Sequence, residues 1–201
     1  MMPYSLSGWL KADDRRSSAV LQQRGRGKHH ARRRFMPRLD DLEDRKVPSY
    51  VFQTIDPPLA AQGSAAFGIN SSGKVVGEFT DANSVTHGYL LSGGQYTTVD
   101  DPSAVGVTNA FGINASGKIV GNYTDGNGRF HGFLLSGGQY TTLNDPSAGT
   151  GTYQGTSPVA INASGIIIGY YTDSHALFHG FLLSGGQYTN LDDPHAGTGA
   201  L

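Results

Sequence analysis

Most of this chain repeats itself, and the repeat limits its fold more than any other feature. The segment HGFLLSGGQYT stands at 131–141 and again, unchanged, at 179–189, and a copy with one substitution begins at His87. Periods of about 20–50 residues are typical of proteins built from stacked supersecondary units. The chain should therefore contain successive copies of one small structural unit.

A second repeated segment sets the length of that unit. FQTIDPP at 52–58 aligns without gaps with three later segments, at successive offsets of 44, 44 and 48 residues. The extra residues of the last offset lie in the loop 147–158. We expect one repeat domain, residues 50–201, with units 52–95, 96–139 and 140–187 and a partial unit 188–201.

Each unit is predicted to contain four short strands. In the second unit they cover residues 108–114, 118–124, 131–135 and 140–145. Gly117 ends one turn, and Gly137 with Gly138 forms another; glycine supplies the positive φ that tight hairpins require. Pro146 should end the fourth strand, because proline has no backbone N–H to donate. Short turns within a unit and a longer connection after it predict a four-stranded antiparallel meander.

The third strand of each unit is apolar on both faces. In the second unit His131, Phe133 and Leu135 share one face, and Phe130 and Leu134 share the other. A sheet with one face in water would alternate apolar and polar residues, so these sheets should be covered on both sides. The expected fold class is all-β: tandem four-stranded antiparallel repeats that form β-propeller-like blades, in a partial or open array because propellers usually need about 4–8 blades. The alternative is a β-trefoil, which closes with three such units.

The spacing also suggests a register between the second and third strands. If a six-residue connection closes the hairpin, Tyr123 lies opposite Gly132 and covers it, and Thr124 lies opposite His131. The equivalent pairs in the other units are Phe79 with Gly88, Thr80 with His87, Tyr171 with Gly180 and Thr172 with His179.

The charge is divided unevenly along the chain. Residues 1–49 carry twelve Lys or Arg and six Asp or Glu, a net charge of +6, whereas residues 50–201 carry three and ten, a net charge of −7. The basic segment lacks apolar periodicity, so residues 1–49 are predicted to be disordered. Its cluster at 24–38 could neutralise phosphates, but the acidic repeat region argues against a nucleic-acid partner. No apolar run reaches the roughly 18 residues of a membrane span.

Two polar positions recur in every unit and are the candidate binding residues. They are a histidine in the third strand and an aspartate that opens the preceding connection: His87, His131, His179, Asp81, Asp125 and Asp173. The histidines are expected to be half-buried strand residues hydrogen-bonded to threonine or backbone, and each aspartate is expected to cap its own turn. The alternative is a row of imidazoles at one rim that binds an anion, a metal or a glycan.

Other chemistry finds little support in the sequence. His175 and His179 would stand about 13 Å apart in a strand, too far for one metal ion, so no metal site is predicted. Asp100 and Asp101, like Asp192 and Asp193, could pair as catalytic carboxylates, but neighbours on a strand point to opposite faces. No cofactor motif is present. Near-identical units supply the same groups at equivalent places, whereas catalysis needs different groups to converge, so we do not expect an enzyme.

Two segments resemble known bacterial patterns. GINASGKIVGNYTDGNGRFHGFLL at 112–135 is similar to the HAF repeat of predicted exported bacterial proteins, although His-Gly-Phe or His-Gly-Tyr replaces His-Ala-Phe in all three units. PRLDDLEDRKVPS at 37–49 resembles a Leu-Glu-Asp-Arg-x-x-Pro-Ser segment near the start of exported and surface proteins. The resemblance to the HAF repeat covers about residues 52–195. Together the two resemblances imply an extracellular or cell-surface location, but they do not imply that the protein catalyses a reaction.

The function expected from these features is an exported or cell-surface module with a structural or binding role. Several equivalent weak sites favour multivalent binding of a glycan or a protein, and an open array could also associate with itself. The alternative is a fragment of a propeller-type polysaccharide hydrolase or lyase.

Overall fold

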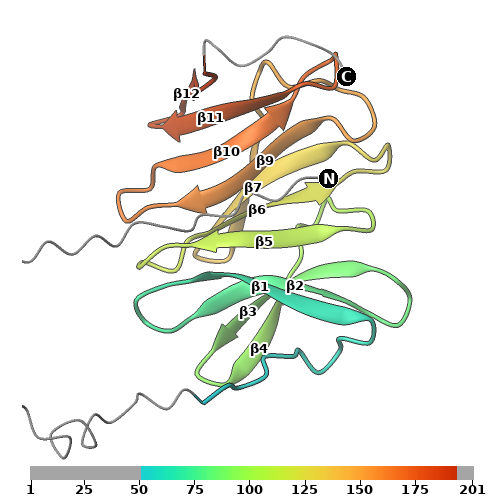
Figure 1. Cartoon of the computed structure of the whole chain (residues 1–201), viewed down its shortest axis with the longest axis vertical. Coiled ribbons are helices and arrows are strands. Elements are labelled where there is room, and N and C mark those ends of the chain that lie inside the picture. Colours follow the sequence, from blue (N-terminus) through green and yellow to red (C-terminus); the bar gives the residue numbers. More distant parts are fainter. Residues whose placement is uncertain (1–50, 194–201) are drawn as a thin grey trace, which may run out of the picture. The chain divides into compact units, whose positions relative to one another are not determined.

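A computed structural model describes residues 51–193, which contain strands, turns and loops and no helix (Figure 1). The twelve strands of this part are β1 (Gly63–Ile69), β2 (Val75–Thr80), β3 (Thr86–Ser92), β4 (Gln95–Val99), β5 (Thr108–Ile113), β6 (Ile119–Thr124), β7 (Phe130–Ser136), β8 (Gln139–Leu143), β9 (Gly155–Ile161), β10 (Ile167–Thr172), β11 (Phe178–Ser184) and β12 (Gln187–Asn190). The predicted all-β class is confirmed. The segments predicted as disordered (1–49) and as the end of the partial unit (194–201) lie outside the described residues.

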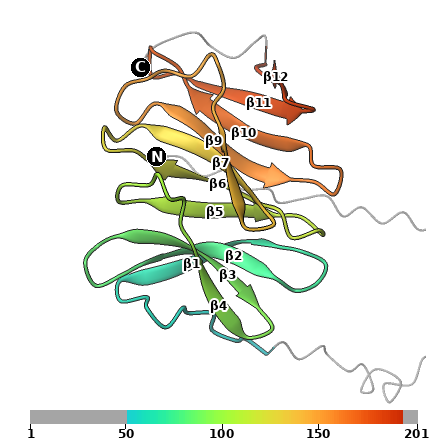
Figure 2. The ribbon, with the colours of Figure 1, turned by 180° about the vertical axis from the view of Figure 1, so that it is seen from behind.

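The strands form three antiparallel meanders in chain order, which we call the first (β1–β4), second (β5–β8) and third (β9–β12) meander (Figures 1 and 2). Within each meander every strand pairs with the next one along the chain. A single parallel pair, Phe130 with Gly155, joins the second and third meanders into an eight-stranded sheet. The equivalent parallel bridge between the first two meanders joins Thr86 and Val107.

The turns follow the glycine pattern. Gly117 has a φ of 82°, and Gly137 and Gly138 have φ of 59° and 82°. These are left-handed conformations that favour glycine, as the sequence predicts. They let β5 return as β6, and β7 return as β8, within a few residues.

The boundaries of the meanders differ from those of the predicted units, because the last strand of each meander lies at the start of the next predicted unit. β4 belongs to the same sheet as β1–β3, and β12 completes the third meander within the predicted partial unit. Residues 52–56, which align with β4, β8 and β12 in sequence, form no strand. Instead Ile55 packs beside Val75, Phe79 and Tyr89 of the first meander.

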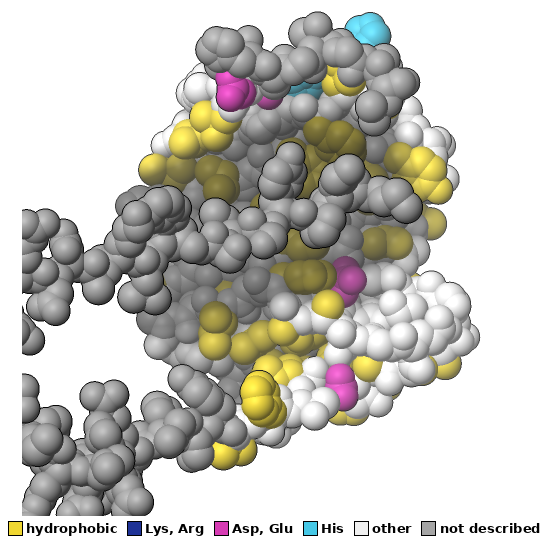
Figure 3. Space-filling model, in the orientation of Figure 1, with side chains coloured by type: hydrophobic (Ala, Val, Ile, Leu, Met, Phe, Trp, Pro, Cys, Tyr) yellow, Lys and Arg dark blue, Asp and Glu magenta, His cyan; other side chains and the backbone are white. Residues whose placement is uncertain are grey.

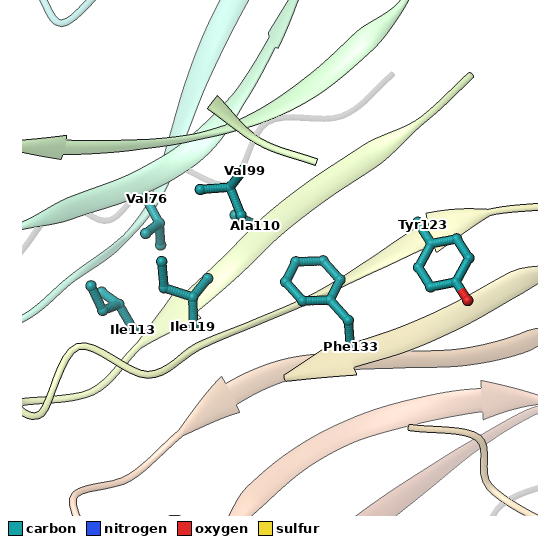
Figure 4. Close-up of a cluster of buried hydrophobic side chains, with 7 residues drawn as sticks. All are labelled: Val76, Val99, Ala110, Ile113, Ile119, Tyr123 and Phe133. Atoms are coloured by element: carbon teal, nitrogen blue, oxygen red, sulfur yellow. The ribbon is translucent and has the colours of Figure 1, made fainter. Parts of the chain in front are cut away.

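Hydrophobic side chains lie between successive meanders. One cluster joins Val76 and Val99 of the first meander to Ile119, Tyr123 and Phe133 of the second (Figure 4). A second cluster joins Val120 of β6 to the third meander. All six residues of β6 are buried, so the prediction that both faces of this sheet are covered is confirmed for the second meander.

A glycine in the second strand of each meander makes room for an aromatic ring. Gly121 pairs with Phe133, and a Cβ on Gly121 would meet Asn109 O at 1.9 Å and the Phe133 ring at 2.9 Å. Gly77 with Tyr89 and Gly169 with Phe181 repeat the arrangement. An aromatic residue therefore does cover a strand glycine, but not the pair that the sequence suggested.

The predicted register between the second and third strands is wrong by one residue. Tyr123 pairs with His131, Thr124 with Phe130 and Gly132 with Asn122. The other meanders show the same shift: Phe79 pairs with His87 and Tyr171 with His179, Thr80 with Thr86 and Thr172 with Phe178, and Gly88 with Glu78 and Gly180 with Tyr170. The cause is the turn, because Asp125 N donates to Arg129 O and closes five residues rather than six.

Asparagine side chains link one meander to the next. Asn70 Nδ2 donates to Asn114 O at 3.0 Å, and Asn114 Nδ2 donates to Asn162 O at 3.1 Å. Each of these residues also caps its own turn through Oδ1, as Asn114 does for Lys118 N at 3.0 Å. The repeated Gly-Ile-Asn or Ala-Ile-Asn segment thus fixes the spacing of neighbouring units.

Candidate functional site

The recurring aspartates cap the turn between the second and third strands. Asp125 Oδ1 accepts hydrogen bonds from Asn127 N at 2.8 Å and from Arg129 N at 3.0 Å. Asp81 does the same for the residues two and four positions on, and so does Asp173. The predicted capping role is confirmed. It leaves the Oδ2 atom of each aspartate turned toward the next strand.

That second oxygen faces the recurring histidine. In the second meander His131 Nε2 lies 3.0 Å from Asp125 Oδ2, and His131 Nδ1 lies 3.1 Å from Asn144 Oδ1. In the first meander His87 Nδ1 lies 2.7 Å from Asp100 Oδ2 and its Nε2 lies 3.6 Å from Asp81 Oδ2. The expected bond from histidine to a cross-strand threonine is wrong, because the register shift places an aromatic residue opposite the histidine.

The third meander repeats this arrangement. His179 Nδ1 lies 2.5 Å from Asp192 Oδ2, and His179 Nε2 lies 3.5 Å from Asp173 Oδ2. We call these groups the first, second and third clusters: Asp81, His87 and Asp100; Asp125, His131 and Asn144; Asp173, His179 and Asp192. Each places an imidazole between two oxygen atoms, one near each ring nitrogen.

An aromatic ring holds each imidazole in place. His87 stacks on Phe79 with ring centroids 5.1 Å apart, His131 on Tyr123 at 5.1 Å and His179 on Tyr171 at 4.9 Å. These aromatic residues are buried in the sheet, so the histidine rotamer is fixed by the core beneath it. The clusters are thus rigid parts of the sheets rather than side chains on free loops.

The sequence reasoning missed the third member of each cluster. Asp100, Asn144 and Asp192 each follow their histidine by thirteen residues, a spacing that could have shown the link. Asp100 and its neighbour Asp101 contact different groups, as expected for neighbours in an extended chain. Asp101 is buried and its Oδ1 accepts a hydrogen bond from Ser103 N at 2.9 Å, whereas Asp100 binds His87.

Asp81, Asp125, Asp173 and Asp192 have lowered pKa values. The hydrogen bond from His131 is the largest cause that lowers the pKa of Asp125 from 3.8 to about 2. The pKa of Asp192 is lowered mainly by His179, and the bond to Asp192 raises the pKa of His179 above 6.5. For Asp81 and Asp173 the main cause of a lowered pKa is a backbone N–H at the end of the turn. All of these aspartates are therefore ionised at neutral pH.

The first cluster lies beside a hollow in the surface. A hollow of about 260 Å³ is lined by the polar residues Asp81, His87, Asp100 and Thr98 and by the apolar residues Leu59, Phe79 and Ala82. A smaller hollow of about 130 Å³ lies on another side of His87 and Asp100 and is also lined by Asp101 and by Gly106–Thr108. His87 and Asp100 therefore line both hollows.

No group of three or more possible metal ligands is found in residues 51–193. In the first and third clusters the two carboxylates contact opposite nitrogens of one ring, so they cannot share an ion with it. His175 is exposed and contacts Asp173 rather than His179. On the face seen in Figure 3 the visible charged side chains of the described residues are acidic.

The similarity of this chain to known proteins is distant. No family model matches the chain, and no curated protein does. Among solved structures, the chain is similar to one described as a fucose lectin from Kordia zhangzhouensis in complex with methyl-fucoside, at 13% sequence identity and a TM-score of 0.39. The match covers 64% of this chain and 96% of the lectin chain. The described residues also hold no helix with the length and apolar character that a membrane span needs.

Proposed function

We propose that the repeat region is a carbohydrate-binding module that acts outside the cell or at its surface. The observation that supports this is the hollow at the first cluster, whose lining combines Asp81, His87 and Asp100 with the apolar side chains of Leu59 and Phe79. Because the cluster recurs in the other meanders, one chain offers several equivalent polar groups. Export and a relationship to HAF repeats belong to the same proposal.

The chemistry of the hollow fits a sugar. A sugar ring presents hydroxyl groups that donate hydrogen bonds and a C–H face that packs on apolar side chains. Asp81 and Asp100 supply charged acceptors, which make stronger hydrogen bonds than neutral ones. Leu59 and Phe79 supply the apolar contact. A net acidic surface favours a neutral ligand of this kind over a phosphate-rich one.

Repetition favours binding over catalysis. The clusters supply similar groups at equivalent places, so their modest affinities would combine through effective concentration on a polymeric glycan. A glycosidase needs a general acid with a raised pKa, whereas the cluster aspartates with shifted pKa values are all shifted downward. The alternative, a fragment of a polysaccharide hydrolase or lyase, draws no support from these carboxylates.

The architecture in this proposal is an open array of propeller-like blades. Each meander packs its face on the next, and the connection runs from the last strand of one to the first strand of the next. The described residues close no ring or barrel. Stacking in chain order favours the blade interpretation over a β-trefoil.

The test is a glycan panel followed by calorimetry on the full chain with a small oligosaccharide from the panel. Replacing Asp100 by alanine removes an acceptor of the first cluster and should weaken binding at least tenfold, about 1.4 kcal/mol. Asp56→Ala is the matched control, because this exposed carboxylate lies outside the clusters. Failure to bind any glycan, or an equal effect of both substitutions, would refute the proposal.

Export is tested separately from binding. The gene expressed from residue 1 in a bacterial host should yield protein that added protease digests in intact cells. Protein found only in the cytosolic fraction of such cells would contradict the proposed location.

A further inference from the structure

The contacts between successive meanders follow one rule. Val76 and Val99 of the first meander pack on Ile119, Tyr123 and Phe133 of the second. In the next contact the same places are taken by Val120 and Leu143, which pack on Ile167, Tyr171 and Phe181. Leu90 and Leu134 join these contacts from the third strand. Each meander therefore has a forward face that receives the next meander and a backward face that lies on the previous one.

The forward face of the third meander has the same apolar residues but no covering. Its counterparts of Val76 and Val99 are Ile168 and Leu191, and Leu182 is the counterpart of Leu90. Ile168 is 46% exposed and Leu191 53%, whereas Val76 is 0% and Val99 2% exposed. This surface can bury its apolar residues only against something outside the described residues.

A polar group on this face also lacks its usual partner. Asn70 and Asn114 each donate their Nδ2 to a backbone carbonyl of the following meander. Asn162, the next in the series, is exposed and caps its turn through Oδ1 to Ile166 N at 2.9 Å. Within the described residues its Nδ2 has no equivalent acceptor. By analogy with Asn70 and Asn114, the acceptor for Asn162 Nδ2 would be the backbone carbonyl of the equivalent asparagine in a further unit.

The chain carries a matching surface at its other end. The backward face of the first meander consists of Val75, Phe79 and Tyr89, the counterparts of Ile119, Tyr123 and Phe133. Ile55 and Ala60 of the preceding segment, which align with Val99 and Ala104, already pack on it, and Val75, Phe79 and Tyr89 are 8%, 3% and 1% exposed.

Among the described residues no counterpart of Val76 or Leu90 precedes this face, and a hollow of about 430 Å³ lies against it. It is lined by Pro57, Pro58, Leu59, Phe79, Tyr89 and Tyr96, with Gly94, Gln95, Thr97 and Thr98.

We propose that these two faces bind each other in two copies of the chain, head to tail. Ile168 and Leu182 of one copy enter the 430 Å³ hollow of the next, and Asn162 Nδ2 donates to Asn70 O of that copy. Because the two faces are different, the contact is heterologous, and it can repeat into a ring or a filament. A contact of the forward face with itself would leave Asn162 Nδ2 without this acceptor.

Docking requires one short segment to move. Leu191 and the second copy's Ile55 are counterparts of the same residue, so they compete for one place. β12 is held to β11 by four residue pairs, and Leu191 N donates to Gly180 O at 2.8 Å. Residues 52–56 have no strand partner. The segment 52–56 is therefore the part that withdraws.

A sequence difference between the repeats should make the contact between two copies weaker than the contacts between meanders within one chain. Gly68 and Gly112 lie where a Cβ would stand 2.8 Å from a carbonyl oxygen of the next meander. The third meander has Ala160 at this position. Its Cβ keeps a docked copy slightly farther away, so the association should be reversible and concentration-dependent.

Sedimentation velocity of the full chain over a range of concentrations tests the proposal. The wild type should associate. Ile168→Glu and Asn162→Asp should each weaken the association at least tenfold; the second keeps the Oδ1 cap and loses only the donor. Tyr153→Glu, at an exposed loop position, should leave it unchanged. Ala160→Gly should strengthen it. A wild type that stays monomeric, or an Ile168→Glu and Asn162→Asp pair that both associate like wild type, would overturn the proposal.

Mixing two variants distinguishes head-to-tail from face-to-face contact. Pro58→Glu places a charge at the hollow and should block the backward face, while Ile168→Glu blocks the forward face. Each variant alone should be monomeric, and an equal mixture should form a dimer through its two intact faces. A mixture that stays monomeric would refute the head-to-tail arrangement. Neither substituted residue lines the hollow at the first cluster, but the two hollows share Leu59, Phe79 and Thr98, so glycan binding is measured on each monomeric variant separately from the mixture.

Discussion

Replacing Gly121 by alanine should destabilise the repeat region, although alanine normally suits a strand better than glycine. The new Cβ would meet Asn109 O at 1.9 Å and Phe133 Cε1 at 2.9 Å. The first neighbour is backbone in a paired strand, and the second belongs to a fully buried ring (Figure 4). Neither can move without disturbing the cluster between the first and second meanders.

The magnitude follows from two opposing effects. Overpacking a well-packed core costs about 1–3 kcal/mol, and a backbone contact this short belongs at the upper end of that range. The loss of glycine's extra freedom in the unfolded chain returns about 0.5–1 kcal/mol. The net loss should be about 2 kcal/mol, which lowers Tm by about 4–8 °C in a domain of this size.

Thermal and urea unfolding followed by circular dichroism provide the assay. Gly126→Ala is the matched control, because a Cβ at this position meets nothing within 4 Å. It should leave Tm unchanged or raise it slightly. Equal Tm values for wild type and Gly121→Ala would show that the ring of Phe133 does not need the space above this glycine.

Two further predictions concern pH. Asp125 has a folded pKa of about 2, below its usual 3.8, so the stability it contributes is present above pH 3.8 and is lost as pH falls toward 2; urea midpoints of Asp125→Asn should therefore fall less steeply than those of wild type across this interval, and parallel curves would contradict the assignment. His179 has a folded pKa raised above 6.5 by Asp192, so its contribution is present below pH 6.5 and is lost as pH rises through the folded value. His179→Gln and Asp192→Asn should both remove this alkaline loss from the Tm profile, and a profile like that of wild type in either variant would count against the pair.

The repeat was enough to predict the strands but not their exact pairing. The predicted strands of the second unit agree with β5–β8 within about two residues, because apolar runs between glycine turns leave few other choices. The register of β6 with β7 came out one residue off. The register depends on whether five or six residues close the turn, and the hydrogen bonds that Asn127 N and Arg129 N donate to Asp125 Oδ1 decide this.

The sequence predicted two of the three residues in each cluster. His131 and Asp125 stand out because they recur, and the capping role of the aspartate follows from its place before a turn. The sequence did not link Asn144 to them, because it directly follows β8 and meets the histidine only after β8 folds beside β7. The hollow beside His87 could not be predicted, since Leu59 reaches it from the segment before the first strand.

The sequence alone determined that this chain repeats, that each copy is a four-stranded meander, and where the turns lie, because period and glycine placement are local properties. Only the tertiary structure decided which residues face each other across strands and which faces remain open. Val76 and Ile168 occupy equivalent places in the repeat, yet one is fully buried and the other is half exposed. The burial of such a residue depends on whether another sheet packs on it, and the residue type alone does not show this.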